Sequence, residues 1–318
     1  MKPASLSGRL ANLDSEKLKL VERLLARKNT QDPRDFRNAE ARSNHVPPFD
    51  EEALQSFSSP AGRTKAGTKK FYDKINQQLS STIFGEHSTF LNYGYVADGS
   101  PQQSQVELPR RLMNRTSIML VLELIGSFDL TGKRLLDVGC GRGGALAVIN
   151  EFFSAALKTG IDLSSEAAAF SRKTHRYPHT YFVEGDAEQL PFGAGAFDVV
   201  TNIESSHSYP AVSTFYSEVN RVLLPGGYFL YTDVFSAADF DDHRQKLRQL
   251  GFTIEQDRDV TRNVLLSCRE TAEVRSRAFV DVAERGVINN FLSTPGSAVF
   301  EAMRSGNAAY RIFRIRKD

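Results

Sequence analysis

Short apolar runs alternate with amphipathic segments from about residue 131 to the end of the chain. The apolar runs have the length and the Val, Ile, Leu and Phe content of buried strands, and they predict strands at Arg134–Val138, Leu157–Asp162, Thr180–Val183, Phe197–Asn202, Gly227–Asp233, Phe252–Glu255 and Tyr310–Arg316. The amphipathic segments predict helices at Ala145–Phe153, Glu166–Thr174, Val212–Leu223 and Asp241–Leu250. This alternation indicates an α/β fold whose mostly parallel sheet is covered on both faces.

The rest of the chain is organised around this predicted core, which spans residues 131–318. A long helical insertion at about residues 270–304 precedes the last strand. Residues 63–130 predict a helical lid or cap, which includes the helix candidate Pro109–Gly126, the aromatic run FLNYGYV, and apolar residues at helical spacing, namely Phe71, Ile75, Leu79 and Ile83. Residues 1–62 predict a short helix followed by a polar linker that would not fold alone.

Composition excludes several classes of protein. The 318 residues carry 40 Lys and Arg against 38 Asp and Glu, a balance that argues against nucleic acid as the main partner. The most apolar run, Ile118–Ile125, is short and contains Glu123, and the N-terminus lacks the apolar segment of a signal peptide. No group of His, Cys and acidic residues has the spacing that is typical of metal ligands. We therefore expect a soluble, cytoplasmic protein with no membrane contact and no metal.

The glycine-rich loop after the first predicted strand fits two motifs. In the stretch RLLDVGCGRGG, Gly139, Gly141 and Gly144 satisfy GxGxxG, which is typical of dinucleotide-binding folds. The same stretch satisfies [DE]xGxGxG through Asp137, Gly139, Gly141 and Gly143, the loop that holds S-adenosylmethionine (SAM). The loop alone leaves open whether a hydride or a methyl group is transferred.

Three further motifs favour methyl transfer. The stretch Glu184–Ala187 is followed by Gln189–Phe192 and by the start of the fourth strand, which resembles the "GDA..LPF....FD.V" run of class I SAM-dependent methyltransferases. The stretch Leu223–Gly227 is similar to the "LkPGG" turn of the same family. This resemblance implies a Rossmann-like, seven-stranded fold whose last strand is antiparallel. It also implies SAM as cofactor and S-adenosylhomocysteine as product.

The expected cofactor contacts follow the ends of consecutive strands. Asp137 is placed to bind the methionine ammonium, and Asp162, followed by Leu163, to accept hydrogen bonds from the ribose hydroxyls. The resemblance implies that Asp186 binds the adenine amino group and that the backbone of Ala187 faces the ring. The predicted set is completed by the loop glycines, which allow close approach, and by the end of the fourth strand: Gly139, Gly141, Gly143 and Asn202.

A histidine and a glutamate follow the fourth strand and are candidates for catalysis. Glu204 and His207 are three residues apart, so they can face the same side of one turn. His207 could remove a hydroxyl proton while Glu204 fixes its tautomer. The alternative, that His207 only packs or caps the loop, stays open. His87, before the aromatic run, is a second candidate for the acceptor pocket, and Tyr93 is a candidate for contact with SAM.

Three segments resemble a narrower group: ESSHSYP at 204–210, FLNYGY at 90–95 and PGSAVFEAMRSGNAAYRIFRIRK at 295–317. This group contains O-methyltransferase domains of polyketide synthase and peptide synthetase assembly lines, with phthiotriol-type lipid methyltransferases as relatives. The resemblance implies methylation of the β-hydroxyl of an acyl chain tethered to an acyl carrier protein. Met1–Lys28 is similar to the connectors of such synthases. The basic groups Arg110-Arg111-Arg115 and Arg244-Lys246-Arg248 could dock the carrier protein.

Other functions remain open on the sequence. One is C-methylation at the α-carbon of a β-ketoacyl thioester, and another is methylation of a free lipid or small molecule. A catalytically silent SAM-binding scaffold belongs to a different class. An NAD-dependent oxidoreductase is disfavoured, because no dehydrogenase base motif follows the glycine loop.

Overall fold

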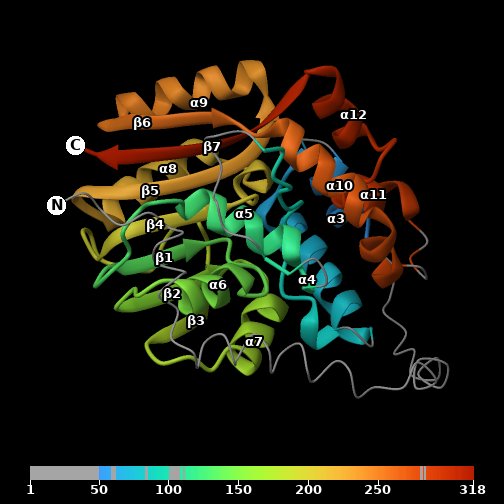
Figure 1. Ribbon diagram of the computed structural model, residues 1–318, viewed down its shortest axis with the longest axis horizontal. Coiled ribbons are helices and arrows are strands. Elements are labelled where there is room, and N and C mark those ends of the chain that lie inside the picture. Colours follow the sequence, from blue (N-terminus) through green and yellow to red (C-terminus); the bar gives the residue numbers. More distant parts are fainter. Residues whose placement is uncertain are drawn as a thin grey trace.

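The computed structural model describes residues 50–58, 62–82, 85–99, 108–109, 112–279, 282 and 284–318. The connector-like segment Met1–Lys28 and the pair Arg110-Arg111 lie outside the described residues. Within the described part, one mixed sheet forms the centre, helices cover it on both faces, and a separate group of helices stands at one end of its strands (Figure 1).

The sheet has the strand order β3-β2-β1-β4-β5-β7-β6. Its strands are β1 (Arg134–Val138), β2 (Leu157–Asp162), β3 (Thr180–Glu184), β4 (Phe197–Ile203), β5 (Leu223–Ser236), β6 (Phe252–Asp259) and β7 (Ala308–Lys317). The pairs β1–β2, β1–β4, β2–β3 and β4–β5 are parallel, whereas β7 is antiparallel to both β5 and β6. The predicted seven-stranded fold with an antiparallel last strand is confirmed.

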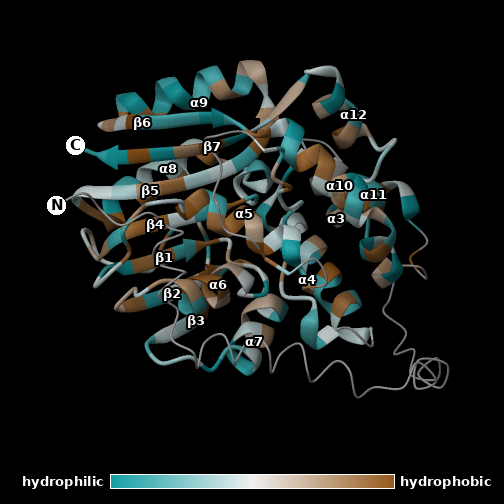
Figure 2. Cartoon of the chain, in the orientation of Figure 1, coloured by the Kyte–Doolittle hydropathy of each residue, from teal (hydrophilic) through white to brown (hydrophobic). Residues whose placement is uncertain are grey.

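Successive residues of the central strands point to opposite faces of the sheet and enter two different cores. Leu135 belongs to the cluster under α5 (Arg115–Ile125) and α6 (Gly144–Phe152). Its neighbour Leu136 belongs to the cluster under α8 (Val212–Val222) and α9 (Ala237–Gln249). Figure 2 shows the corresponding pattern, with apolar segments where the helices meet the sheet and a hydrophilic outer surface on α9. Burial on both faces explains why these strands read as continuous apolar runs.

The lid combines segments that are far apart in the sequence. Helix α4 (Lys65–Ser81) begins at Thr64, whose side chain accepts a hydrogen bond from the Gly67 N–H at 2.9 Å. Helix α4 packs with α3 (Glu51–Ser58), η6 (Arg277–Phe279) and α11 (Arg285–Phe291) around eight buried residues. We call these residues the lid cluster: Ala53, Phe71, Ile75, Leu79, Phe279, Ile288, Phe291 and Leu292.

The structure draws the boundaries of the regions differently from the sequence prediction. Helix α5, predicted within the lid at 63–130, packs on the sheet beside α6 and belongs to the core. Helix α3 occupies part of the stretch at 1–62 that was predicted as linker, and it packs against α4. The helical insertion begins with α10 (Thr261–Ser276), nine residues before the predicted start, and ends with α12 (Ala298–Ser305).

Candidate active site

A pocket opens between the lid and the carboxyl ends of β1, β2 and β4. The space between its walls measures about 1160 Å³, a figure that includes the open mouth. Its wall contains His207, Glu204 and most of the predicted cofactor residues, namely Asp137, Gly139, Gly141, Asp162, Leu163, Asp186 and Ala187. The structure thus brings most of the predicted cofactor residues and both predicted catalytic residues together around one pocket.

The glycine loop after β1 is shaped around Asp162. The Gly141 N–H donates to Asp162 Oδ2 at 2.7 Å, and the Ser164 N–H donates to Oδ1 at 2.9 Å. Each carboxylate oxygen keeps a second lone pair for a hydroxyl donor. Gly139 has φ of 68°, and a Cβ there would collide with the side chain of Ser205. The sharp turn after β1 therefore requires glycine.

Two predicted cofactor residues do not line the pocket. Gly143 caps the start of α6, and a Cβ on it would lie 2.6 Å from the ring of His175. Asn202 donates from Nδ2 to the Val138 carbonyl at 2.8 Å and to Ser205 Oγ at 2.7 Å. Both residues shape the pocket from behind, because the glycine loop and the β4 turn are packed against them. Direct contact of these two residues with SAM stays a prediction.

Asp137 has an unused acceptor in the wall of the pocket. Its side chain is 1% exposed, Oδ1 accepts from Thr201 Oγ1 at 2.7 Å, and Oδ2 has no partner among the described residues. Burial raises its pKa to about 7, although the Thr201 hydrogen bond acts in the opposite direction. A buried carboxylate with a free oxygen is suited to a cationic ligand group, so the residues present fit the ammonium of SAM.

This raised pKa makes SAM affinity dependent on pH. Below pH 7, Asp137 must lose its proton to pair with the ammonium, so we expect SAM affinity to increase with pH between about 5.5 and 7, by up to about tenfold per unit. Calorimetry in buffers of different ionisation enthalpy measures the affinity and the proton released. The Asp137→Asn variant should bind more weakly with a flat pH dependence. An unchanged slope in this variant would assign the effect to another group.

The predicted adenine end of the pocket is tied to the lid. Lys65, the first residue of α4, contacts Asp186 Oδ2 at 2.6 Å and Glu188 at 2.9 Å, and it lines the pocket. Asp186 Oδ1 also accepts from the Glu188 N–H at 2.8 Å. The Asp186 carboxylate is therefore held at the mouth of the pocket, and the lid helix closes against the residues expected to bind adenine.

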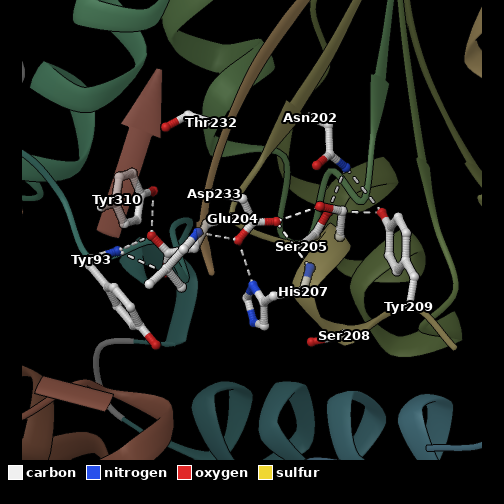
Figure 3. Close-up of polar contacts among 12 residues, drawn as sticks. Tyr93, Asn202, Glu204, Ser205, His207, Ser208, Tyr209, Thr232, Asp233 and Tyr310 are labelled. Atoms are coloured by element: carbon white, nitrogen blue, oxygen red, sulfur yellow. Dashed lines mark hydrogen bonds and ion pairs between the residues drawn. The ribbon is translucent and has the colours of Figure 1, made fainter. Parts of the chain in front are cut away.

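The structure assigns His207 a different partner from the predicted one. His207 lies in η5 (Ser206–Ser208), and its Nδ1 lies 2.7 Å from Asp233 Oδ1 (Figure 3). Asp233 is fully buried near the end of β5, and its Oδ2 accepts from the His207 N–H at 3.0 Å and from Ser206 Oγ at 2.6 Å. Because Asp233 engages Nδ1, Nε2 is the ring nitrogen available to a substrate. The prediction that Glu204 fixes the tautomer of His207 is therefore wrong.

The charges around His207 favour its protonated form. Burial alone would lower the pKa of His207, but the charge of Asp233 and its hydrogen bond raise the pKa above the usual value, and Glu204 adds to this effect. Arg63 acts in the opposite direction. The pKa of Asp233 is held below its usual range by His207 in spite of burial. Asp233 thus stays ionised beside an imidazole that is a stronger base than an ordinary histidine.

Glu204 connects the lid to the sheet. It lies directly after β4 with a backbone φ of 53°. This left-handed conformation turns the side chain toward one partner in the lid and one partner on β7. The Tyr93 N–H donates to Oε2 at 2.9 Å, and the Tyr310 hydroxyl donates to the same oxygen at 2.7 Å (Figure 3). Burial raises the pKa of Glu204 to about 7. Glu204 still lines the pocket, but its contacts make it an anchor for the aromatic segment that contains Tyr93.

The remaining candidates are distributed around the site. Tyr93 is buried in the pocket wall, whereas His87 is exposed and does not line it. In the basic group on α9, Arg244 is paired with Asp257 and Asp241, and Lys246 is paired with Asp242. Among the described residues, no group of three or more His, Cys, Asp or Glu could hold a metal ion. None of the helices that the structure describes is long and apolar enough to cross a membrane.

The fold and the pocket agree with what is found in known proteins. Residues 136–231 match a family described as "Methyltransferase domain". The chain is 36% identical over 253 residues to the fatty-acid O-methyltransferase of Mycolicibacterium smegmatis, covering 76% of this chain and 90% of that protein. It is 32% identical to the phthiotriol/phenolphthiotriol dimycocerosates methyltransferase of Mycobacterium leprae, covering 83% and 98%. The chain therefore belongs to the class I SAM-dependent methyltransferases, and SAM is its cofactor.

Comparison with a solved structure supports the fold but not a particular reaction. The crystal structure of the [4+2]-cyclase SpnF is similar with a TM-score of 0.64 and 23% identity, covering 80% of this chain and 97% of that chain. SpnF is a cyclase, so similarity of fold does not by itself define the reaction at the pocket. That reaction has to be argued from the side chains.

Proposed function

We propose that the protein is a SAM-dependent O-methyltransferase that methylates a hydroxyl group on an acyl or lipid chain. The observation that carries this proposal is the pairing of His207, in the pocket wall, with the buried Asp233 behind it, their Nδ1 and Oδ1 atoms 2.7 Å apart. An aliphatic hydroxyl is a weak nucleophile at neutral pH and needs a base in contact with it. A histidine held and made more basic by a buried carboxylate meets that requirement.

The residues of the pocket have different roles in the proposed reaction. When bound, SAM supplies an electrophilic methyl group on a sulfonium. Asp137, Asp162 and Asp186 are the carboxylates that would hold its ammonium, ribose and adenine. His207 Nε2 accepts the hydroxyl proton as the oxygen–methyl bond forms, and Asp233 stabilises the resulting imidazolium. The methyl group leaves the sulfonium sulfur, which becomes a neutral thioether, and the positive charge passes to His207, where Asp233 compensates it. The aromatic lid around Tyr93 excludes water from this exchange.

A specific observation supports a second candidate, methylation of a carboxylate. The M. smegmatis relative is named as a fatty-acid O-methyltransferase. A carboxylate is already ionised at neutral pH and needs no base. In that case the raised pKa of His207 would serve to keep a positive charge beside the acceptor. The two candidates thus require opposite protonation states of the same residue.

The acceptor class can be tested with a panel of substrates of equal chain length. We would incubate the protein with SAM and β-hydroxyacyl, β-ketoacyl and unsubstituted acyl acceptors, each offered both as the free acid and as an acyl carrier protein thioester. Product mass and methyl position then report the reaction. We expect the hydroxyl oxygen to gain one methyl group, and preference for the thioester would support the carrier protein as partner. Methylation only at the α-carbon or only at the carboxylate contradicts the proposal.

A further inference from the structure

One end of the pocket beneath the lid is lined by aromatic rings. Phe291, from α11, and Tyr72, from α4, both line it, and their ring centroids are 6.3 Å apart. Leu91 of the aromatic segment lines the pocket as well and packs against the lid cluster. Phe291 is 6% exposed although it faces the pocket, so its ring closes this end. Such a wall offers few hydrogen-bond partners to a polar ligand. A hydrocarbon chain, by contrast, would leave water on binding there, which is favourable.

The space behind Phe291 is filled by other apolar side chains of the lid cluster. The ring of Phe291 packs edge-on against Phe71 at 5.8 Å and against Phe279 at 6.2 Å between centroids. Neither Phe71 nor Phe279 lines the pocket. Phe291 is therefore the partition between the pocket and the interior of the lid cluster.

Tyr72 connects this aromatic end to the catalytic group. Its hydroxyl is hydrogen-bonded to Ser208 Oγ at 2.9 Å, and Ser208 directly follows His207 in η5. Its ring faces Phe291 on the other side. An acceptor whose reacting oxygen contacts His207 can thus extend its chain along the Tyr72 ring and reach Phe291.

We propose that Phe291 is the residue that limits the length of the acyl chain accepted by the enzyme. This inference rests on the proposed function, because it takes the acceptor to be an acyl chain. The occupant of the aromatic end is the distal part of that chain, and the phenyl ring of Phe291 is its end stop. Removing the ring joins the pocket to the space that the ring vacates in the lid cluster.

The test compares Phe291→Ala with the matched control Phe279→Ala in the full chain. Both changes remove a buried phenyl ring from the same cluster, and the two rings have exposed fractions of 6% and 5%. We therefore expect the two variants to lose a similar amount of stability, which thermal unfolding measures. We would measure kcat/KM for hydroxyacyl acceptors of increasing chain length. Phe291→Ala should shift the optimum to longer chains, with a gain of up to about fourfold for each newly buried methylene.

The control variant and the milder Phe291→Leu make every outcome informative. Phe279→Ala should keep the chain-length optimum of the unchanged protein, and Phe291→Leu should give an intermediate shift even if Phe291→Ala fails to fold. An unchanged optimum in both Phe291 variants, or an equal shift in Phe279→Ala, overturns the role of Phe291 while the proposed function stands. If the unchanged protein methylates no acyl acceptor of any length, the proposed function itself fails, and the inference fails with it.

Discussion

Replacing His207 with alanine is expected to lower turnover by at least about 100-fold, the low end of the effects of removing a general base, while SAM affinity stays near normal. The reason is geometric, because His207 lies in the acceptor part of the pocket and is held by Asp233, whereas the predicted cofactor carboxylates come from other strands. Single-turnover rates with saturating SAM and calorimetric titration measure the two quantities separately.

The matched control for this prediction is His243→Ala. His243 is also a buried histidine, but it packs against Phe235 on the outer side of the sheet, 4.3 Å between centroids, and does not line the pocket. This variant should lose stability without a comparable loss of turnover in the folded fraction. If His207→Ala retains full turnover, His207 is a packing residue and the base must be sought elsewhere in the pocket.

Replacing Asp162 with alanine is expected to weaken SAM binding by about 10- to 100-fold, the range for losing hydrogen bonds to a charged group. Asp162 would bind the ribose hydroxyls, and it also holds the glycine loop through the Gly141 N–H at 2.7 Å. Both effects act on the cofactor site, and the strand that carries Asp162 stays packed between its neighbours. Calorimetric titration with SAM measures the change, and circular dichroism checks the fold.

Asp198→Ala is the control for the Asp162 variant. Asp198 lies near the start of β4, at the end of the strand opposite to the pocket, where it pairs with Arg134 at 3.0 Å. Loss of this carboxylate should leave SAM affinity unchanged. Equal affinity of the Asp162→Ala variant and the unchanged protein would remove Asp162 from the cofactor site and with it the predicted ribose contact.

Much of the fold follows from local pattern. Strands β1 and β2 were predicted to the residue, because both are buried on two faces and carry an acidic residue at or next to the end that faces the pocket. The boundaries of the lid were not predictable in this way. The amphipathic helix α4 must bury an apolar face, but its periodicity does not reveal that the covering residues come from α11, more than 200 positions further along the chain.

The sequence predicted which strand ends form the site, but it did not predict which side chains contact one another there. Spacing placed Glu204 three residues from His207, yet the left-handed backbone at Glu204 turns its carboxylate toward Tyr93 and Tyr310. The actual partner, Asp233, is 26 residues from His207. A signal for it did exist, since Asp233 is an acid at the end of an apolar strand, as Asp137 and Asp162 are.

The central claim, that His207 acts as a neutral base for a hydroxyl, is tested most directly by the pH dependence of the single-turnover rate with saturating SAM. The claim predicts a rate that rises with pH through the raised pKa of His207 and then levels off. Asp233→Asn should move this rise to lower pH, because the charge that raises the pKa is gone, and should lower the plateau by about 10-fold through loss of the fixed tautomer. A rate that falls as the pH rises through this range would mean that His207 acts in its charged form, and would contradict the account.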